Sequence, residues 1–150
     1  RFLTANYVTE REAYRYDVVK LEWQFNRVRS TSSPQEFKRY QRFINPENPA
    51  SPFTKYSREA TRDVEIYNLS MNLKAETQTA KVYFTTTVKR DKNTQTNNWV
   101  ATLSLKLPEL IVDQETNEVL QWVSEKDDYK TIEEIDFRVE QYNVQEITGG

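Results

Sequence analysis

Apolar residues in the first third of the chain recur at the spacing of an amphipathic helix. Along residues 7–28 the intervals alternate between three and four, apart from one step of seven across Arg11. The stripe consists of Tyr7, Tyr14, Val18, Leu21, Phe25 and Val28. We therefore predict one long helix here. Val19 and Trp23 widen the stripe, so we expect this helix to lie against a broad surface such as a sheet.

A second helix is predicted from Ser33-Pro34-Gln35-Glu36, which combines a capping box with a proline at the first helical position. Its apolar side is formed by Phe37, Tyr40 and Ile44. The helix should end at Asn45-Pro46, because the residue before a proline disfavours helical backbone. Residues 45–53 contain three prolines and no periodicity, which predicts a stiff loop inside a single domain.

From Arg62 onward the apolar spacing changes to two, which is typical of half-buried strands. The parity changes between Ile66 and Leu69, so we predict a β-bulge there. Two more strands alternate over residues 80–88 and 99–107, and the polar residues 91–98 should form the turn between them. A final strand carries Ile135, Phe137 and Val139 on one parity, with an irregularity before Tyr142.

This order of elements predicts an α+β fold, in which two to three N-terminal helices pack on one face of about four curved antiparallel strands. Residues 108–134 have the weakest pattern. In that region we expect residues 110–112 to prolong the third strand. A second apolar patch follows at Val119, Leu120, Trp122 and Val123.

The composition excludes several classes of enzyme. The chain has 150 residues with no His, no Cys, and Gly only at Gly149 and Gly150. Catalytic triads, zinc fingers and disulfide frameworks need the first two residue types. Phosphate-binding loops need glycine in the interior of the chain. Carboxylates, Lys and Tyr are the remaining acid–base groups, and the acidic pairs Asp127-Asp128 and Glu133-Glu134 lie among other charges. One buried carboxylate inside the sheet would still allow an enzyme or a small-ligand binder.

The net charge of −2 is unevenly distributed. Residues 1–62 carry 12 basic and 7 acidic side chains, whereas residues 63–150 carry 9 and 16. This asymmetry favours charge-complementary protein partners over nucleic acid. The densest basic cluster is Lys38, Arg39 and Arg42, which helical spacing directs away from the core as a candidate partner-facing patch. The acidic residues lack the spacing of a calcium loop, so we expect no metal and no cofactor.

Arg11 is the one charged residue that interrupts the first apolar stripe. A cation at that position must reach a carboxylate, a carbonyl or water. Three interpretations remain open: the side chain reaches past the sheet edge to solvent, it forms an internal ion pair that holds the helix on the sheet, or it faces a second protomer.

Several ordered motifs resemble the VirB-eight-type subunit of bacterial type IV secretion systems. The segment from Tyr7 to Tyr14 resembles the Y-V-x-x-R-E-x-Y opening of that family, with Tyr7, Val8, Arg11, Glu12 and Tyr14 at the motif positions. The family's W-V-A-T strand resembles Trp99, Val100, Ala101 and Thr102, and its last strand resembles Phe137, Val139 and Tyr142. The resemblance extends over about residues 5–145.

The resemblance implies a cone-shaped fold like that of nuclear transport factor two. It also implies a single periplasmic domain over residues 1–150, held in the bacterial inner membrane by one helix that lies upstream, after a short cytoplasmic tail. The chain begins at Arg1, so we expect it to be an excised piece of such a protein. The family consists of non-enzymatic assembly subunits that self-associate, as dimers or larger assemblies, and contact other channel subunits during DNA or effector export. No direct contact with nucleic acid is expected.

The chain departs from the family just before the last strand. Members commonly have Asn-Pro-x-Gly there, and this chain has Glu133-Glu134-Ile135-Asp136. The preceding stretch from Pro108 to Thr131 is also longer than usual. Partner contacts made by this loop are therefore expected to differ from those of the family.

Overall fold

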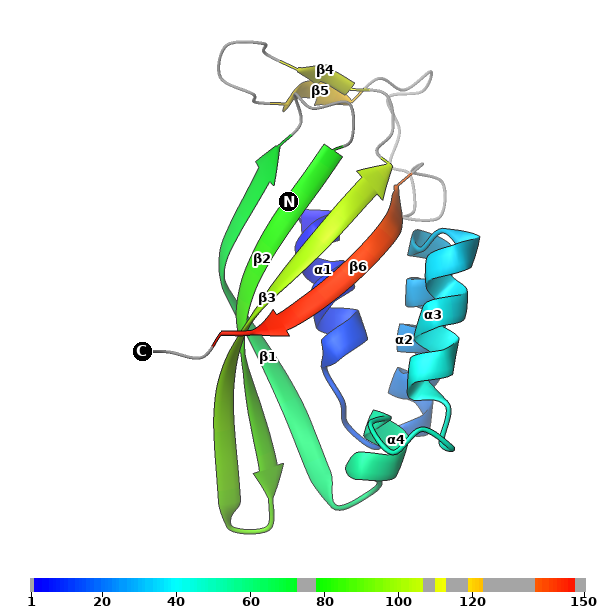
Figure 1. The fold of residues 1–150 in the computed structure, drawn as a ribbon, viewed down its shortest axis with the longest axis vertical. Helices are drawn as coiled ribbons and strands as arrows, with labels where there is room; N and C mark the ends of the chain where they lie inside the picture. Colours follow the sequence, from blue (N-terminus) through cyan, green and yellow to red (C-terminus); the bar gives the residue numbers. More distant parts are fainter. Residues whose placement is uncertain (1, 73–77, 107–109, 113–118, 123–136, 148–150) are drawn as a thin grey trace.

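The structure, a computed structural model, describes residues 2–72, 78–106, 110–112, 119–122 and 137–147. Four helices precede the main sheet: α1 (Phe2–Glu12), α2 (Val18–Thr31), α3 (Pro34–Ile44) and the short α4 (Pro52–Lys55). The main sheet contains β1 (Ala60–Asn72), β2 (Gln78–Arg90), β3 (Asn93–Lys106) and β6 (Arg138–Glu146), all antiparallel in the order β1-β2-β3-β6. Figure 1 shows the helices gathered on one side of this curved sheet, which confirms the predicted α+β fold.

The prediction of one long first helix is wrong, because the chain breaks into α1 and α2. Tyr14 lies in extended backbone between them and exchanges two backbone hydrogen bonds with Arg62 of β1. Asp17 then starts the next helix, since its carboxylate accepts hydrogen bonds from the backbone N–H groups of Val19 and Lys20. Satisfying these free N–H groups makes a new helix start favourable at this point.

Val19 and Trp23, which we expected to lie against a sheet, do not pack on one. Val19 is 77% exposed and Trp23 is 55% exposed. Helix α2 instead packs through Val28, which is fully buried, and through Phe25, whose ring lies 5.2 Å from that of Phe37 on α3. Helix α3 corresponds to the second helix predicted from the sequence and agrees with that prediction. Ser33 caps α3, and the helix ends at Ile44, before Asn45.

The strands agree with the predicted periodicity. Ala80, Val82 and Phe84 are buried on β2, and Ala101 and Leu103 are buried on β3. The predicted bulge in β1 is confirmed by a register shift between Ile66 and Asn68. The irregularity before Tyr142 is confirmed by a second shift, where β6 skips one residue opposite Ser104 and Leu105. This skip lets both Val139 and Tyr142 point into the core.

The turn between β2 and β3 is much shorter than predicted. It contains only Asp91 and Lys92, and residues 93–98 belong to β3. Asp91 has φ 52, a left-handed conformation that Asp tolerates well. The β2–β3 hairpin extends past the helices (Figure 1), so its strands remain paired where no core covers them and their side chains are polar.

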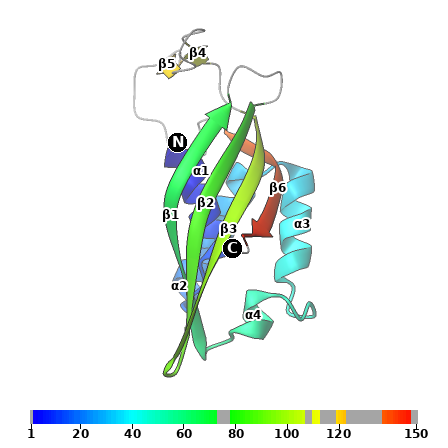
Figure 2. The same cartoon turned by 60° about the vertical axis from the view of Figure 1, so that its left-hand side comes forward.

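Residues 110–112 do not prolong the third strand within the main sheet. They form β4 (Leu110–Val112), which pairs with β5 (Val119–Trp122) in a separate two-stranded sheet. This small sheet lies beyond one end of the main sheet in both views (Figures 1 and 2). The expectations for residues 133–136, including Ile135, fall outside the described residues.

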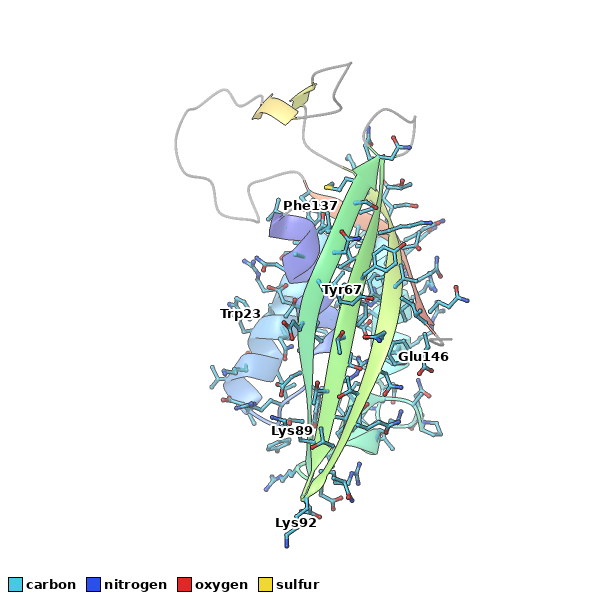
Figure 3. The ribbon with its side chains drawn as sticks, turned by 90° about the vertical axis from the view of Figure 1, so that its left-hand side faces the viewer. Trp23, Tyr67, Lys89, Lys92, Phe137 and Glu146 are labelled. Atoms are coloured by element: carbon cyan, nitrogen blue, oxygen red, sulfur yellow. The ribbon has the colours of Figure 1, made fainter. Side chains whose placement is uncertain are left out.

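The core lies between the helices and the sheet face turned toward them. Its largest fully buried side chains include Tyr7 on α1, Phe84 on β2, Leu103 on β3, and Phe137 just before β6. The opposite sheet face is uncovered by helices, and Tyr67 is seen there, near Tyr83 at 6.3 Å between ring centroids (Figure 3).

Candidate functional site

Arg11 forms an internal ion pair. Its guanidinium Nη1 lies 3.0 Å from the Glu36 carboxylate of α3 and donates a 2.9 Å hydrogen bond to the Tyr7 hydroxyl. The guanidinium also lies over the Tyr142 ring of β6, 4.2 Å from its centroid. The side chain is only 10% exposed, so the structure favours the internal ion pair over a side chain that reaches past the sheet to solvent.

Glu36 is fully buried and joins three elements. Its carboxylate accepts hydrogen bonds from Arg11, from Arg39 at 2.9 Å, and from the backbone N–H of Tyr142 at 2.9 Å. The predicted capping box is therefore only half formed: Ser33 accepts from the Glu36 N–H, but the Glu36 side chain turns into the core. Sequence reasoning missed this role. The signal was its position four residues before Tyr40, on the buried side of the helix.

Glu12 extends the same network toward the sheet. One carboxylate oxygen accepts from Arg62 of β1 at 2.7 Å, and the other accepts from the Tyr142 hydroxyl at 2.6 Å. Arg62 lies over the Trp99 ring, and Trp99 donates its indole N–H to Thr86 at 2.7 Å. We call Arg11, Glu12, Glu36, Arg62 and Tyr142 the motif network, which ties α1 and α3 to β1 and β6.

Most of the other family-motif residues are buried in the interior of the domain. Tyr7, Val8 and Tyr14 are buried in the N-terminal part, and Ala101, Phe137 and Val139 are buried in the sheet core. Val100 differs, since the alternation of β3 turns it toward the outer face of the sheet, where it is half-buried. Six of the family-motif positions are thus explained by packing, and three more, Arg11, Glu12 and Tyr142, by the motif network.

Burial holds the phenols of this region in the neutral form. It raises the pKa of Tyr142 well above its ordinary value and the pKa of Tyr40 to about 12, and it also raises that of Tyr7. Burial alone would lower the pKa of Arg11, but Tyr7 and Glu36 beside it raise that pKa overall. At neutral pH the guanidinium is charged and the phenols are protonated, so none of these groups is poised to move a proton.

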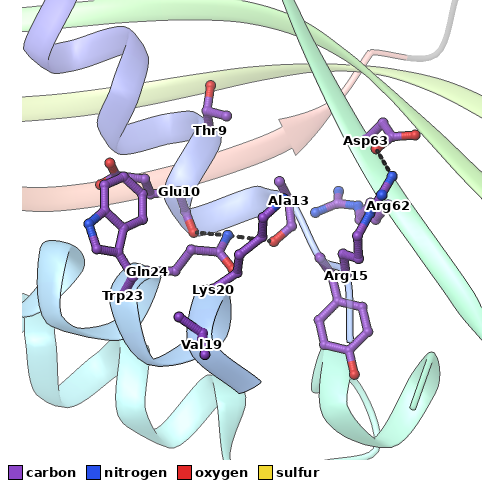
Figure 4. Close-up of a pocket in the computed structure, with 11 residues that line it drawn as sticks. Thr9, Glu10, Ala13, Arg15, Val19, Lys20, Trp23, Gln24, Arg62 and Asp63 are labelled. Carbon is purple, nitrogen blue, oxygen red and sulfur yellow. Dashed lines mark hydrogen bonds and ion pairs between the residues drawn. The ribbon is translucent and has the colours of Figure 1, made fainter. Parts of the chain in front are cut away.

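A groove of about 650 Å³ lies between α1, α2 and β1 (Figure 4). Glu10 and Trp23 face it from the helices, and Arg62 and Asp63 face it from the strand. The Glu10 carboxylate lies 3.3 Å from Arg27, whose guanidinium also covers the Trp23 ring at 5.1 Å. Burial raises the pKa of Glu10 above its ordinary value, despite the opposing effect of Arg27.

A carboxylate buried inside the domain is present, because Glu36 is 1% exposed, but its oxygens are occupied by Arg11, Arg39 and the Tyr142 N–H. The interior face of the sheet is filled by Phe84, Leu103, Phe137 and Tyr142, and Glu10 lies in the outer groove. Over the described ranges, no three acidic side chains are placed to hold a metal ion. No helix of the described part is both long enough and apolar enough to cross a bilayer.

The predicted basic patch is on the surface. Lys38, Arg39 and Arg42 are all exposed on α3, although Arg39 also binds Glu36. Tyr40 is buried and Phe37 is half-buried behind them, as helical spacing predicted, whereas Phe43 is 43% exposed. The patch is thus available to a partner, and its aromatic residues are mostly committed to the core.

A helix-backed, curved antiparallel sheet with a filled interior is the α+β cone of the nuclear-transport-factor-two type. The family model of the VirB8 protein matches residues 1–121, so the chain belongs to the VirB8 family, whose members are components of type IV secretion systems. No curated protein matches the sequence significantly.

Solved structures of this family share the fold. The VirB8 protein of Agrobacterium tumefaciens is 20% identical, with a TM-score of 0.70, over 99% of this chain and 90% of that one. The soluble domain of TrwG, type IV secretion machinery from Bartonella grahamii, is 16% identical with a TM-score of 0.69, over 98% and 92%. A TraE protein in complex with 2-(2-furyl)isonicotinic acid is 19% identical with a TM-score of 0.69, over 97% and 93%.

Proposed function

We propose that this chain is the periplasmic domain of a non-enzymatic assembly subunit of a type IV secretion system. Residues 1–150 form one domain, which an upstream helix holds in the bacterial inner membrane after a short cytoplasmic tail. The subunit self-associates, as a dimer or a larger assembly, and contacts other channel subunits for the export of DNA or effectors. Membership of the VirB8 family supports this proposal.

One observation carries the non-enzymatic part of the proposal. The polar residues of the family motif are used in contacts within the domain, where Arg11 and Glu36 join α1 to α3, and Glu12 joins α1 to β1 and β6. Each charged group faces an opposite charge or a hydrogen-bond donor. Such an arrangement stabilises one packing of the elements and presents no free acid or base to a substrate.

The exposed cluster of Lys38, Arg39 and Arg42 is the proposed partner-facing patch. Its partners are proteins, and the function requires no cofactor and no direct contact with nucleic acid. A scaffold needs surfaces of defined charge because like charges facing each other exclude wrong partners.

A small-ligand site is the second candidate, and the groove beside Trp23 is the observation that favours it. A TraE relative is known in complex with a substituted isonicotinic acid. Titrating the protein with that acid and following the fluorescence of Trp23 tests this second candidate function. A saturable change in fluorescence that is lost in the Trp23→Phe variant would support a ligand site in the groove. A titration with no change in fluorescence would rule it out.

Deletion of the gene in its native host tests the principal proposal. Export of the system's cargo should stop and should return when the full-length protein is supplied from a plasmid. Unchanged export in the deletion strain would contradict the proposal.

A further inference from the structure

The sheet face turned away from the described helices carries an apolar strip that crosses three strands. Tyr67 of β1 is 56% exposed near the middle of this face (Figure 3), and its ring lies beside that of Tyr83 on β2. Val100 of β3 lies directly opposite Tyr83 in the strand register and is half-buried on the same face. We call these three residues the outer strip. Val100 is a family-motif residue that the core does not bury, so the outer strip gives it a place in the structure.

Side chains that both donate and accept hydrogen bonds flank the outer strip. On one side the register aligns Thr85 with Asn98, and the Thr85 hydroxyl donates to the Asn98 side-chain oxygen at 2.8 Å. On the other side it aligns Thr102 of β3 with Asn143 of β6, and both are exposed. Hydroxyl and amide groups offer donors and acceptors together. They therefore suit a ligand whose own surface carries hydroxyl and amide groups.

The rows beside the outer strip have no net charge. The register adds to them one carboxylate, Glu65 of β1, and one ammonium group, Lys81 of β2. An anionic polymer would need a clear basic excess, which the domain presents on α3 instead, at Lys38 and Arg42. The core of a typical protein interface is enriched in arginine and depleted in serine. A neutral face of hydroxyl and amide groups thus fits an uncharged ligand better than either of these partners.

The two tyrosine rings supply the apolar contact that a sugar polymer requires. Their centroids lie 6.3 Å apart, and the ring planes are inclined by 44°. A pyranose ring has a face of C–H bonds, which packs on an aromatic ring, and hydroxyl groups at its edge, which form hydrogen bonds. Tyrosine suits this contact because it combines an apolar ring with a polar tip.

We propose that the outer strip and the polar rows beside it bind the uncharged glycan backbone of the periplasmic cell wall. Sugar rings pack on Tyr67 and Tyr83, and the hydroxyl and N-acetyl groups of the glycan bond to the threonine and asparagine side chains. This inference rests on the periplasmic location in the proposed function and adds a ligand to that assembly subunit. The contact holds the subunit against the wall that the secretion channel has to cross.

Co-sedimentation of the 150-residue chain with purified cell-wall sacculi tests the proposal. Tyr67→Ala should weaken binding by about tenfold or more, because truncation of a central aromatic anchor is costly. Tyr67→Trp keeps a ring and should bind at least as well as the unmodified chain. The matched control is Phe43→Ala, since Phe43 is 43% exposed on α3 and lies outside the sheet. Near-ultraviolet circular dichroism verifies that each variant is folded.

A second probe separates the glycan from the charged peptides attached to it in sacculi. Chitohexaose is an uncharged oligomer of N-acetylglucosamine, and calorimetric titration should show saturable binding that Tyr67→Ala weakens. High salt should leave this binding unchanged, because no charged group of the ligand takes part.

Three results would overturn the inference. The first is no binding to either probe. The second is binding to sacculi alone that high salt abolishes, which would assign the contact to the charged peptides. The third is a Tyr67→Ala variant that binds both probes normally but loses a contact with another channel subunit or a second copy, which would make this face a protein interface. Each of these results leaves the proposed function intact, since the deletion strain tests that function separately through export.

Discussion

Arg11 and Glu36 lie 25 residues apart in the sequence, and their side chains meet at 3.0 Å in the interior of the domain. The pair joins the first helix to the third. Glu36 also accepts the Tyr142 backbone N–H of the edge strand β6, so one carboxylate holds two helices and the sheet together. Burial makes this pair costly to break, because either partner left alone is an uncompensated charge.

The substitution Glu36→Gln should therefore destabilise the domain by about 3–5 kcal/mol, since it leaves the Arg11 guanidinium buried without a counter-charge. Urea unfolding followed by circular dichroism measures the change. The exposed Glu47→Gln is the matched control and should change stability by less than about 0.5 kcal/mol. A loss below about 1 kcal/mol in Glu36→Gln would show that Arg11 is adequately solvated without its partner.

Tyr142→Phe removes one hydroxyl that donates a 2.6 Å hydrogen bond to Glu12. Glu12 keeps its bond to Arg62, so we expect a loss of about 1.5–3 kcal/mol, the range for a hydrogen bond to a charged group. The exposed Tyr67→Phe serves as the control in the same urea titration. If the two variants are equally stable, the hydrogen bond from Tyr142 to Glu12 contributes nothing to the stability of the domain.

Asp17 explains why the N-terminal region forms two helices. Asp17→Ala removes the side-chain acceptor for the N–H groups of Val19 and Lys20, which should cost about 1 kcal/mol in thermal or urea unfolding. Asp17→Ser keeps a capping oxygen and should recover most of that loss. If the serine and alanine variants are equally unstable, capping is not the reason for the break.

Glu10 should impose a pH dependence on stability. Because burial raises its pKa in the folded state, the folded protein binds a proton more tightly than the unfolded chain. Glu10 thus contributes stability that is present below its ordinary pKa of 4.5 and is lost as the pH rises through the raised value. Glu10→Gln should gain stability relative to the unmodified protein over that window. A difference that is constant from pH 4 to pH 7 would contradict the shift.

Local patterns in the sequence predicted the strands well. In β2 and β3, alternation alone identified the buried residues Ala80, Val82, Phe84, Ala101 and Leu103. Alternation is reliable here because one sheet face packs against the helices while the other remains uncovered. The bulge in β1 was visible for the same reason, since one extra residue reverses the parity of every residue after it.

The helices were harder to predict. The stripe from Tyr14 to Val18 has helical spacing, yet Tyr14 bonds to Arg62, 48 residues away in the sequence, and Asp17 restarts the helix. The role of Glu36 depends likewise on Arg11 and Tyr142, which come to it from distant parts of the chain. Contacts between residues that are distant in the sequence cannot be predicted from local periodicity. The periodicity indicated only that Arg11 would need a polar or charged partner.

The most direct test of the account is an export assay in the native host. A deletion strain would receive the full-length protein carrying E10Q/Y142F, which alters one buried carboxyl and one buried phenol whose pKa values are raised by burial. If the domain acts only as a scaffold, this strain should export cargo at the wild-type rate when the variant is present at the wild-type level. Loss of export at an equal level of folded protein would show that these groups perform chemistry or bind a ligand, and would contradict the account.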